Sequence, residues 1–395
     1  IDWRVSPTFS NIQDPDVRKT AFTYSNTDTT FSAGAGGNPS RIWRELEEVN
    51  WVAKFDITRN SQAFGRDAKY KFGSSYIYKE RDYEILSYDL QFFGAQPDFG
   101  IDPNAVWQDQ YLYPNGTIYL NSGNNTPNPN AYNSNSKNYG VYVSTELNPT
   151  AKLKAVLGLR GEKFIQRHTG RDVEYANLGS GNNLENEVVI DDFDLFPSVN
   201  LVYAVNDDQN VRLSYSKTIA RPSFKELSFA QIIDPLTNRI FNGGLFQYSD
   251  WDGQLGVTRI NNFDLRWEIF FPGTEILSVS AFYKTFDDPI ELVRIPEQQT
   301  STEYQPRNVG DGRVLGGEVE FKKDLSFLTP ALSNFYIGTN VTVVNSEITM
   351  TDREYNARLQ YEKNGENVKN TRNMAGQAPF IINTSIGYEN FDNGL

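Results

Sequence analysis

Cysteine is absent from this sequence of 395 residues, and histidine occurs once, as His168. Without cysteine the chain can form neither a disulfide framework nor a thiolate site. One histidine cannot build a histidine-based metal cluster, and we expect His168 at a strand end beside Arg167 instead of in a catalytic triad. The GAGG segment at 34–37 follows no strand-to-helix pattern, so we expect a loop there and no phosphate cradle. The sequence therefore predicts no enzyme, no cofactor and no resident metal.

Long apolar runs and an excess of basic residues are missing as well. No stretch approaches the roughly 18 apolar residues of a membrane helix. Asp and Glu (50) outnumber Lys and Arg (37), which gives a net charge of −13. This acidic balance argues against nucleic acid as a partner, because nucleic-acid-binding proteins present basic surfaces. A membrane protein is not excluded, since membrane β-strands carry a much weaker hydropathy signal than helices do.

Strand-forming and turn-forming residues dominate what is present. Aromatic residues make up 14% of the chain, with 22 Tyr, 26 Phe and 29 Gly. Apolar and polar residues alternate in NVRLSYSKT at 210–218 and in FDLRWEIFF at 263–271. A period of two gives a strand one apolar and one polar face. This pattern predicts about twelve strands, near residues 1–10, 41–58, 66–80, 137–148, 151–168, 191–205, 209–219, 260–271, 275–287, 309–323, 335–349 and 378–390.

Short and long connections alternate between the predicted strands. NPT at 148–150, NDD at 206–208 and PGT at 272–274 are tight turns. The long connections are 11–40, 81–136, 169–190, 220–259, 288–308 and 350–377. Membrane barrels of the bacterial outer membrane have this asymmetry, with the long loops outside the cell. At the Arg221-Pro222 step a strand leaves the sheet, because proline cannot donate a ladder hydrogen bond.

The polar faces decide between a membrane barrel and a soluble β protein. A soluble sandwich or propeller would have more even spacing and an apolar inner face. Here charged residues recur on the polar face of strand after strand, and a dry core could not accept them. A water-filled lumen could, while the apolar face meets lipid and closure removes open edges. We therefore predict an all-β, antiparallel transmembrane barrel whose lumen-facing residues include Arg160, Arg212, Arg266, Glu268, Glu318 and Glu320.

Several stretches, in the same order along the chain, resemble the barrel of TonB-dependent receptors, particularly the branch common in Bacteroidetes. The clearest is FDLFPSVNLVYAVNDDQNVRLSYSKTIARPSFKELS at 193–228. The others, in chain order, are 2–22, 139–164, 261–293, GGEVEFKKDLSFL at 316–328 and GQAPFIINTSIGYEN at 376–390. Together they cover most of the predicted strands, and their order is more specific than any one motif.

The resemblance implies a barrel of about 22 strands with an N-terminal plug domain. Such receptors capture a scarce ligand outside the cell and import it with energy from a TonB-type protein that pulls on the plug. In this sequence no plug, no segment that contacts a TonB-type protein and no final aromatic strand is recognisable. We therefore expect residues 1–395 to be a partial barrel, about strands 7 to 18 of 22. The predicted strands at 1–10 and 378–390 should then not pair with each other.

Candidate ligand contacts lie in the predicted loops. The loop at 97–135 offers flat aromatic faces at Trp107, Tyr111, Tyr113 and Tyr119 among many Asn residues, which suits sugars or aromatic chelates, although the same residues could simply pack the loop. YSDWDG at 248–253 adds Trp251 and oxygen groups that could hold calcium, but it lacks the downstream glutamate of an EF-hand loop.

The sequence favours a bacterial outer-membrane receptor that imports a nutrient ligand, such as an iron chelate or a glycan, without covalent chemistry. Its expected partners are outer-membrane lipid and a TonB-type protein that acts through an N-terminal region. The resemblance also allows a surface lipoprotein over the loops, as in some Bacteroidetes relatives, and the sequence does not decide whether one is present. Two interpretations stay open at this point. One is a passive porin or structural barrel without a plug, and the other is a soluble carbohydrate-binding β protein.

Overall fold

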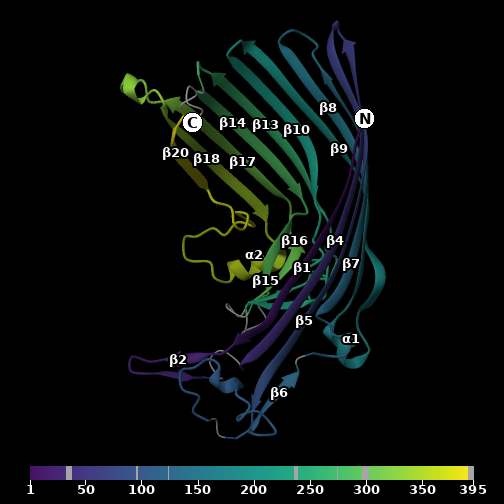
Figure 1. Ribbon diagram of the computed structural model, residues 1–395, viewed down its shortest axis with the longest axis vertical. Coiled ribbons are helices and arrows are strands. Elements are labelled where there is room, and N and C mark those ends of the chain that lie inside the picture. The colour runs from purple at the N-terminus through teal and green to yellow at the C-terminus, as the bar shows by residue number, and fades with distance from the viewer. Residues whose placement is uncertain are drawn as a thin grey trace.

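One large antiparallel sheet dominates the computed structural model, which describes residues 1–32, 38–94, 97–122, 124–234, 239–273, 275–295 and 302–389. The GAGG segment at 34–37 and Thr274 of the PGT turn lie outside the described residues. The long strands pair in chain order, and Figure 1 shows them curving around a hollow. They are β1 (Asp2–Lys19), β4 (Ser40–Ala63), β5 (Arg66–Phe92), β7 (Ala131–Leu147), β8 (Leu153–Arg171), β9 (Asn183–Asn206), β10 (Gln209–Ala220), β13 (Thr258–Phe270), β14 (Ile276–Asp287), β17 (Gly312–Asp324), β18 (Phe335–Thr349) and β20 (Phe380–Tyr388).

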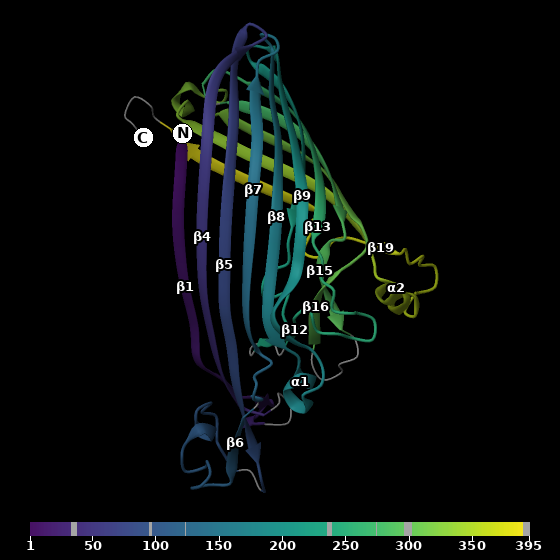
Figure 2. The same ribbon diagram turned by 90° about the vertical axis from the view of Figure 1, so that its right-hand side faces the viewer.

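Each of the twelve predicted strands corresponds to one of these long strands. Short connections alternate with long ones, as predicted, and all the short ones lie at the upper end of the sheet in Figure 2. The connection between β4 and β5 has only two residues, Phe64 at φ 57° and Gly65 at φ 70°. Two successive positive φ angles match the right-handed twist of the flanking strands, which makes this a two-residue hairpin turn.

The predicted strand ends are wrong at the loop side of the sheet, where the strands run further than expected. β1 continues to Lys19, β5 to Phe92, and β9 begins at Asn183. The sequence interpretation placed 11–40, 81–136 and 169–190 in loops. These extensions mix charged and apolar residues on both faces, so they lack the regular alternation that identifies a strand. Ile85, Leu90 and Ile190 of the extensions are buried against loop residues.

The convex face of the sheet carries an apolar band. On β4 it consists of alternate residues from Val49 to Ile57, and it ends at Glu47 on the loop side and Arg59 on the other. These nine residues match the roughly 9–11 residues with which a tilted strand crosses a bilayer. Leu157, Leu213 and Leu277 lie on this face as well.

Aromatic side chains mark both margins of this band. On β9 and β13, Tyr203 and Trp267 lie toward the short turns, whereas Phe193 and Phe263 lie toward the loops. All four are exposed by 37–63%. Aromatic girdles at two levels are typical of outer-membrane barrels, because Trp and Tyr favour the boundary between lipid and water.

The two edges of the sheet are separate. β1 pairs with β4, β20 pairs with β18, and no described residue of β1 pairs with β20. In Figure 1 these strands lie on opposite sides of the hollow. This confirms the expectation that the strands at 1–10 and 378–390 are not partners, and the described sheet is an open, curved wall.

Smaller elements cluster at the loop end of the wall. They are β2 (Phe22–Tyr24), β3 (Thr29–Phe31), β6 (Ile118–Ser122), β11 (Gln231–Asp234), β12 (Arg239–Asn242), β15 (Ile290–Ile295), β16 (Thr302–Asn308), β19 (Thr371–Arg372), and the helices η1 (Ala105–Trp107), α1 (Val173–Leu178), η2 (Pro330–Leu332) and α2 (Asp352–Leu359), of which η2 alone lies by the short turns. Across the described residues, no helix has the length and apolar character needed to cross a membrane. The three buried hydrophobic clusters of the described residues also lie at the loop end.

Candidate functional site at the mouth of the wall

The connection from β10 to β13, residues 221–257, folds back into the hollow of the wall (Figure 1). β10 ends at Ala220, and Pro222 follows at a point where no ladder hydrogen bond is needed, as predicted. Arg221 turns inward, where its Nη2 donates to Glu162 Oε2 at 2.9 Å and its guanidinium lies 4.5 Å from the centre of the Phe164 ring. The loop is therefore anchored to the concave face of β8 from its first residue.

Phe224 extends this anchor across the wall to β5. The cationic groups of Lys79 and Arg81 lie 5.6 and 5.7 Å from its ring centre, and Arg81 Nε donates to Glu48 Oε2 at 2.7 Å. Phe224 also belongs to a buried cluster with wall residues such as Tyr132. Cation–π contacts and apolar burial together hold the loop against the inside of the wall.

A small four-stranded sheet then closes part of the mouth. Its order is β11-β12-β16-β15, so it joins two strands from the connection 221–257 to two from the connection 288–311. The contact between the two connections is parallel, with Ile240 opposite Glu303. Loops far apart in sequence thus form one body, which we call the mouth sheet.

Buried polar groups fix the mouth sheet internally. Asn242 Nδ2 donates to Glu303 Oε2 at 2.7 Å, and the Tyr248 hydroxyl donates to the same oxygen at 3.2 Å. Burial, followed by the nearby charge of Glu303, raises the pKa of Tyr248. Gln305 Nε2 donates to the backbone oxygens of Gly243 and Phe246 at 3.0 and 2.6 Å. Buried polar groups with partners of this kind make one arrangement strongly preferred over others.

Asp250 connects the mouth sheet to a third loop. Arg307 Nη1 of β16 donates to Asp250 Oδ2 at 2.9 Å, and Arg353 Nη1 of α2 lies 2.8 Å from Oδ1. Burial by itself raises the pKa of Asp250, but the hydrogen bonds from Arg353 and Arg307 outweigh it and hold the pKa below the ordinary value. Both carboxylate oxygens are thus used by arginine, and the described residues contain no group of three or more acidic, His or Cys side chains that could hold a metal.

Two cations without ion pairs contact aromatic rings of the mouth sheet: Lys225, which precedes β11, and Arg239 of β12. Lys225 Nζ is 4.2 Å from the ring centre of Phe241, and the Arg239 guanidinium is 6.0 Å from that of Tyr304. Among the described residues neither cation has a carboxylate partner within ion-pair distance. Burial and the nearby Arg44 lower the pKa of Lys225. These four residues, the cation–aromatic patch, are suited to an anionic ligand with flat groups.

The aromatic residues predicted from the loop at 97–135 divide into two pairs. Trp107 and Tyr111 pack in the loop's own hydrophobic cluster, and Trp107 is only 8% exposed. Tyr113 and Tyr119 stack with ring centres 4.8 Å apart and are 62% and 40% exposed, so they remain accessible to a ligand. Trp251 is half-buried elsewhere, and its Nε1 donates to the Gly244 oxygen at 2.7 Å.

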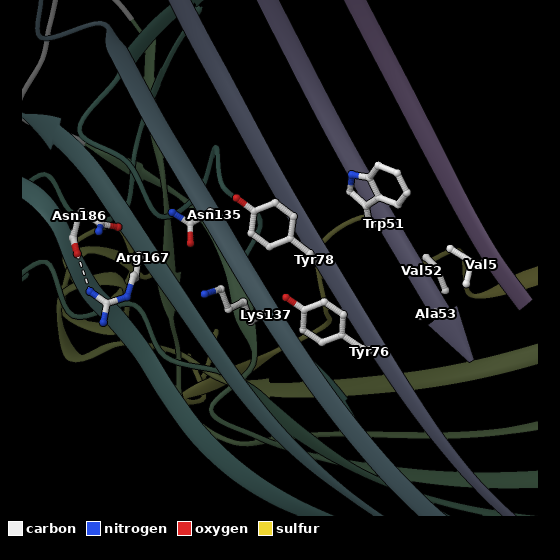
Figure 3. Close-up of a pocket in the computed structure, with 10 residues that line it drawn as sticks. All are labelled: Val5, Trp51, Val52, Ala53, Tyr76, Tyr78, Asn135, Lys137, Arg167 and Asn186. Carbon is white, nitrogen blue, oxygen red and sulfur yellow. Dashed lines mark hydrogen bonds between the residues drawn. The ribbon is translucent and has the colours of Figure 1, made fainter. Parts of the chain in front are cut away.

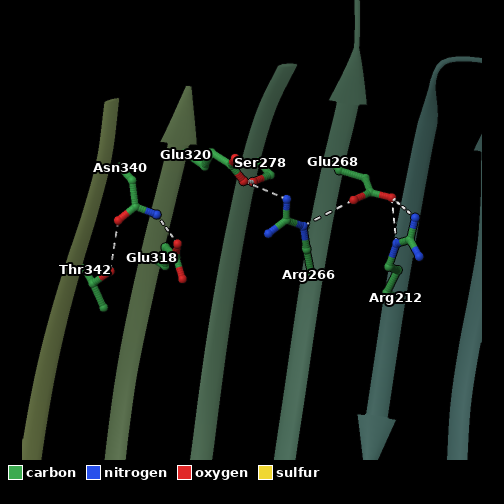
Figure 4. Close-up of polar contacts among 8 residues, drawn as sticks. All are labelled: Arg212, Arg266, Glu268, Ser278, Glu318, Glu320, Asn340 and Thr342. Carbon is green, nitrogen blue, oxygen red and sulfur yellow. Dashed lines mark hydrogen bonds and ion pairs between the residues drawn. The ribbon is translucent and has the colours of Figure 1, made fainter. Parts of the chain in front are cut away.

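The six charged residues predicted to face a lumen lie on the concave face, where the chain also folds back. Five of them lie in a polar row across the wall, in two separate hydrogen-bonded groups (Figure 4). Arg212 Nε donates to Glu268 Oε1 at 2.6 Å, and Arg266 Nη2 donates to Glu320 Oε2 at 2.8 Å, while Asn340 donates to Glu318. Arg160 lies further along, where Gly140 gives its guanidinium room that a Cβ would fill.

The sequence interpretation did not identify Lys225, Arg239 or the residues of the mouth sheet. FKEL at 224–227 lies after the predicted strand at 209–219, where the alternation has ended, and RIF at 239–241 is too short to stand out as a strand. The available signal was the pairing of a cation with an aromatic residue at each place. It is weak, because such pairs are common on protein surfaces.

The chain resembles outer-membrane receptors in both sequence and structure. A family model described as a TonB dependent receptor-like beta-barrel matches residues 2–394. The ferric-catecholate import receptor Fiu of Escherichia coli K12 aligns with a TM-score of 0.51 at 12% identity, over 88% of this chain and 45% of that one. The pyoverdine outer membrane receptor FpvA of Pseudomonas aeruginosa PAO1 gives a TM-score of 0.51 at 13% identity, over 88% and 44%.

The two solved receptors are longer than this chain and differ from it at most positions. The chain spans less than half the length of either solved receptor, 45% and 44%. At this level of identity the likeness shows the fold alone. No curated protein matches the chain, and none of these matches supports the Bacteroidetes branch that the sequence motifs suggested.

Proposed function

This chain belongs to the TonB-dependent receptor-like β-barrel family, whose members are non-enzymatic transporters of the outer membrane, and from that premise we propose that it forms part of the wall and mouth of a receptor that imports a scarce ligand. The ligand binds at the extracellular loops and passes into the lumen with energy transmitted by a TonB-type protein. The observation that carries this proposal is the mouth sheet, because three loops joined by Asp250, Arg307 and Arg353 build a shaped surface over the concave face.

We further propose an anionic iron chelate as the ligand. Two solved structures with the same fold are described by their titles as a ferric-catecholate import receptor and a pyoverdine receptor. The cation–aromatic patch supports the same class, because ferric catecholates combine negative charge with flat rings. A glycan remains the alternative ligand class, for which the exposed pair Tyr113 and Tyr119 would be the contact.

The other two interpretations explain the structure less well. A passive porin has no need for loops cross-linked over its mouth by ion pairs. A soluble carbohydrate-binding protein would not leave aliphatic and aromatic residues exposed along the whole convex face. A surface lipoprotein that covers the loops remains a prediction from the sequence resemblance.

The binding step is tested by removing the two cations of the patch from the full-length receptor. The variant Lys225→Gln/Arg239→Gln should bind the chelate at least about 10-fold more weakly, because each charge-assisted contact contributes about 1.5–3 kcal/mol. The control Arg66→Gln/Lys69→Gln changes the charge equally at the short-turn end of the wall and should bind normally. The ligand itself is first identified by growth of a deletion strain on single iron chelates and single glycans. Growth defects only on glycans would reject the chelate.

A further inference from the structure

A groove on the convex face lies outside the mouth and is not part of the import path. Most of the residues that line it come from β1, β4, β5, β7 and β8, and Figure 3 labels them. The volume of the groove is about 660 Å³. The aromatic, polar and cationic side chains that line it include Trp51, Tyr76, Tyr78, Asn135, Lys137 and Arg167. The register of the sheet places all six on the convex face, opposite the polar lining of the hollow.

The groove lies at the loop-side margin of the apolar band. On β4 the band continues from Trp51 toward the short turns through Ala53 and Phe55, whereas the next convex-face residues from Val49 toward the loops are Glu47 and Glu45. The Tyr76 ring is 5.0 Å from that of Tyr139, which continues the aromatic floor toward β7. This level corresponds to the boundary between acyl chains and headgroups in the outer leaflet.

The two cations at one end of the groove form no ion pair with a described residue. Lys137 is exposed and forms no ion pair with a described residue. Arg167 Nη1 donates to the backbone oxygen of Asn186 at 2.7 Å, as Figure 3 shows, and forms no ion pair with a described residue either. Two positive charges therefore converge on one place at the level of lipid headgroups.

The carboxylates nearest to this place in the register are engaged elsewhere. Glu80 lies beside Asn135 in the register, but it accepts hydrogen bonds from the Tyr78 hydroxyl at 2.7 Å and from Asn133 Nδ2 at 3.3 Å. Asp191 of β9 pairs with Lys163. The convex face thus keeps these acids bound while Lys137 and Arg167 remain available.

We propose that this groove binds a phosphorylated lipid of the outer leaflet. The phosphate lies between Lys137 and Arg167, which bind it as a point charge and as a planar fork of donors. The acyl chains descend over Trp51 and Tyr76 along the apolar band. This inference goes beyond ligand import, and its failure would leave the proposed import function untouched.

Lipid retention by the full-length receptor tests the proposal. Receptor extracted from outer membranes is placed in phosphatidylcholine nanodiscs that contain one tenth bisphosphorylated lipid A, and lipid that stays bound after transfer to detergent is counted by native mass spectrometry. In the variant Lys137→Gln/Arg167→Gln the amount of retained lipid A should fall by a factor of about 20 or more. Each cation near an anionic lipid raises the affinity about 5-fold. The unmodified receptor should retain its lipid A in 10 mM inorganic phosphate, because phosphate alone lacks the apolar contact.

A matched control separates this groove from general charge effects. Lys217→Gln/Arg313→Gln removes the same charge from the convex face of β10 and β17 and should retain lipid A normally. Equal loss in both double variants, or no loss in either, would overturn the proposal, and so would displacement by inorganic phosphate. Unchanged heat-modifiable gel migration shows that each variant is folded.

Discussion

Leu159 and Arg160 are adjacent in the chain, but Leu159 faces lipid and Arg160 faces the water-filled hollow. Leu159 is 46% exposed on the convex face, whereas Arg160 lies on the concave face and donates to Glu162 and Ser75 at 2.6 and 2.7 Å. The alternation of the sequence predicts this division, because a strand sends successive side chains to opposite faces. The partners of Arg160 were not predictable, since they depend on the register between β5, β7 and β8.

Substitution of these two neighbours should therefore have very different costs. Leu159→Arg places a charge in the lipid band and should lower the free energy of unfolding by about 2–4 kcal/mol. Arg160→Lys keeps the charge beside Glu162 in a water-filled hollow and should cost about 1 kcal/mol or less. Urea titrations of the full-length receptor refolding into vesicles measure both values. Equal costs would mean that the two faces are wrongly assigned.

Asp250 holds three loops together, and removal of its charge should loosen them. In Asp250→Asn the buried Arg307 loses its counter-charge, which we expect to cost about 3 kcal/mol locally. Hydrogen exchange in the peptides that cover β12 and β16 should then become about 100-fold faster. Asp252→Asn is the matched control, because the carboxylate of Asp252 accepts from the backbone N–H of Gln254 and forms no ion pair with a described residue. Unchanged exchange in Asp250→Asn would show that the mouth sheet does not depend on this ion pair.

The carboxylate of Asp250 also makes the stability of the mouth sheet depend on pH. Because its pKa in the folded protein is below the ordinary 3.8, the stability it contributes is complete above about pH 4 and is lost as the pH falls through the folded-state pKa. Protection of the mouth sheet should accordingly stay constant from pH 7 to pH 5 and fall between about pH 4 and pH 2. Pepsin cleavage across the acid range follows this change, and Asp250→Asn should be cleaved equally at pH 2 and pH 4.

At the scale of strands and loops, the position of each strand was predictable and its length was not. Every long strand has a predicted counterpart because part of it crosses the apolar band and shows a period of two. The extensions of β1 and β5 carry charge on both faces, with contacts such as Arg81 to Glu48, so their sequence does not differ from that of a loop. The mouth sheet was missed for another reason. Its strands are four to seven residues long and pair between loops, which no local pattern records.

The alternation of short turns and long loops predicts which end faces the outside of the cell. Residues 1–395 contain no cysteine, so once any cysteine elsewhere in the full-length receptor is replaced by serine, a single introduced cysteine reports its own location. Asn115→Cys lies in the loop that projects furthest from the wall in Figure 2, and Asp207→Cys lies in the turn between β9 and β10. A membrane-impermeant maleimide should label Asn115→Cys in intact cells and label Asp207→Cys only after the outer membrane is opened. Labelling of Asp207→Cys alone in intact cells would reverse the orientation.

At the scale of the whole molecule, the described residues form an open wall with two free edges, at β1 and β20. An unpaired edge cannot persist in hydrocarbon, because its backbone groups would lack hydrogen-bond partners. The curvature in Figure 1 and the separation of the edges agree with a wall that is one part of a larger barrel. The polar row on the concave face then lines the lumen, and the mouth sheet stands over it.

Uptake measured with and without the proton gradient tests the central claim most directly. The cells carry the full-length receptor as their only route for the iron chelate that supports growth, and the initial rate of radioactive iron uptake is recorded before and after a protonophore is added. We predict saturable uptake that stops when the gradient collapses, while binding of the chelate to the cell surface persists. Uptake that continues at the same rate without the gradient would contradict the account and identify a passive channel.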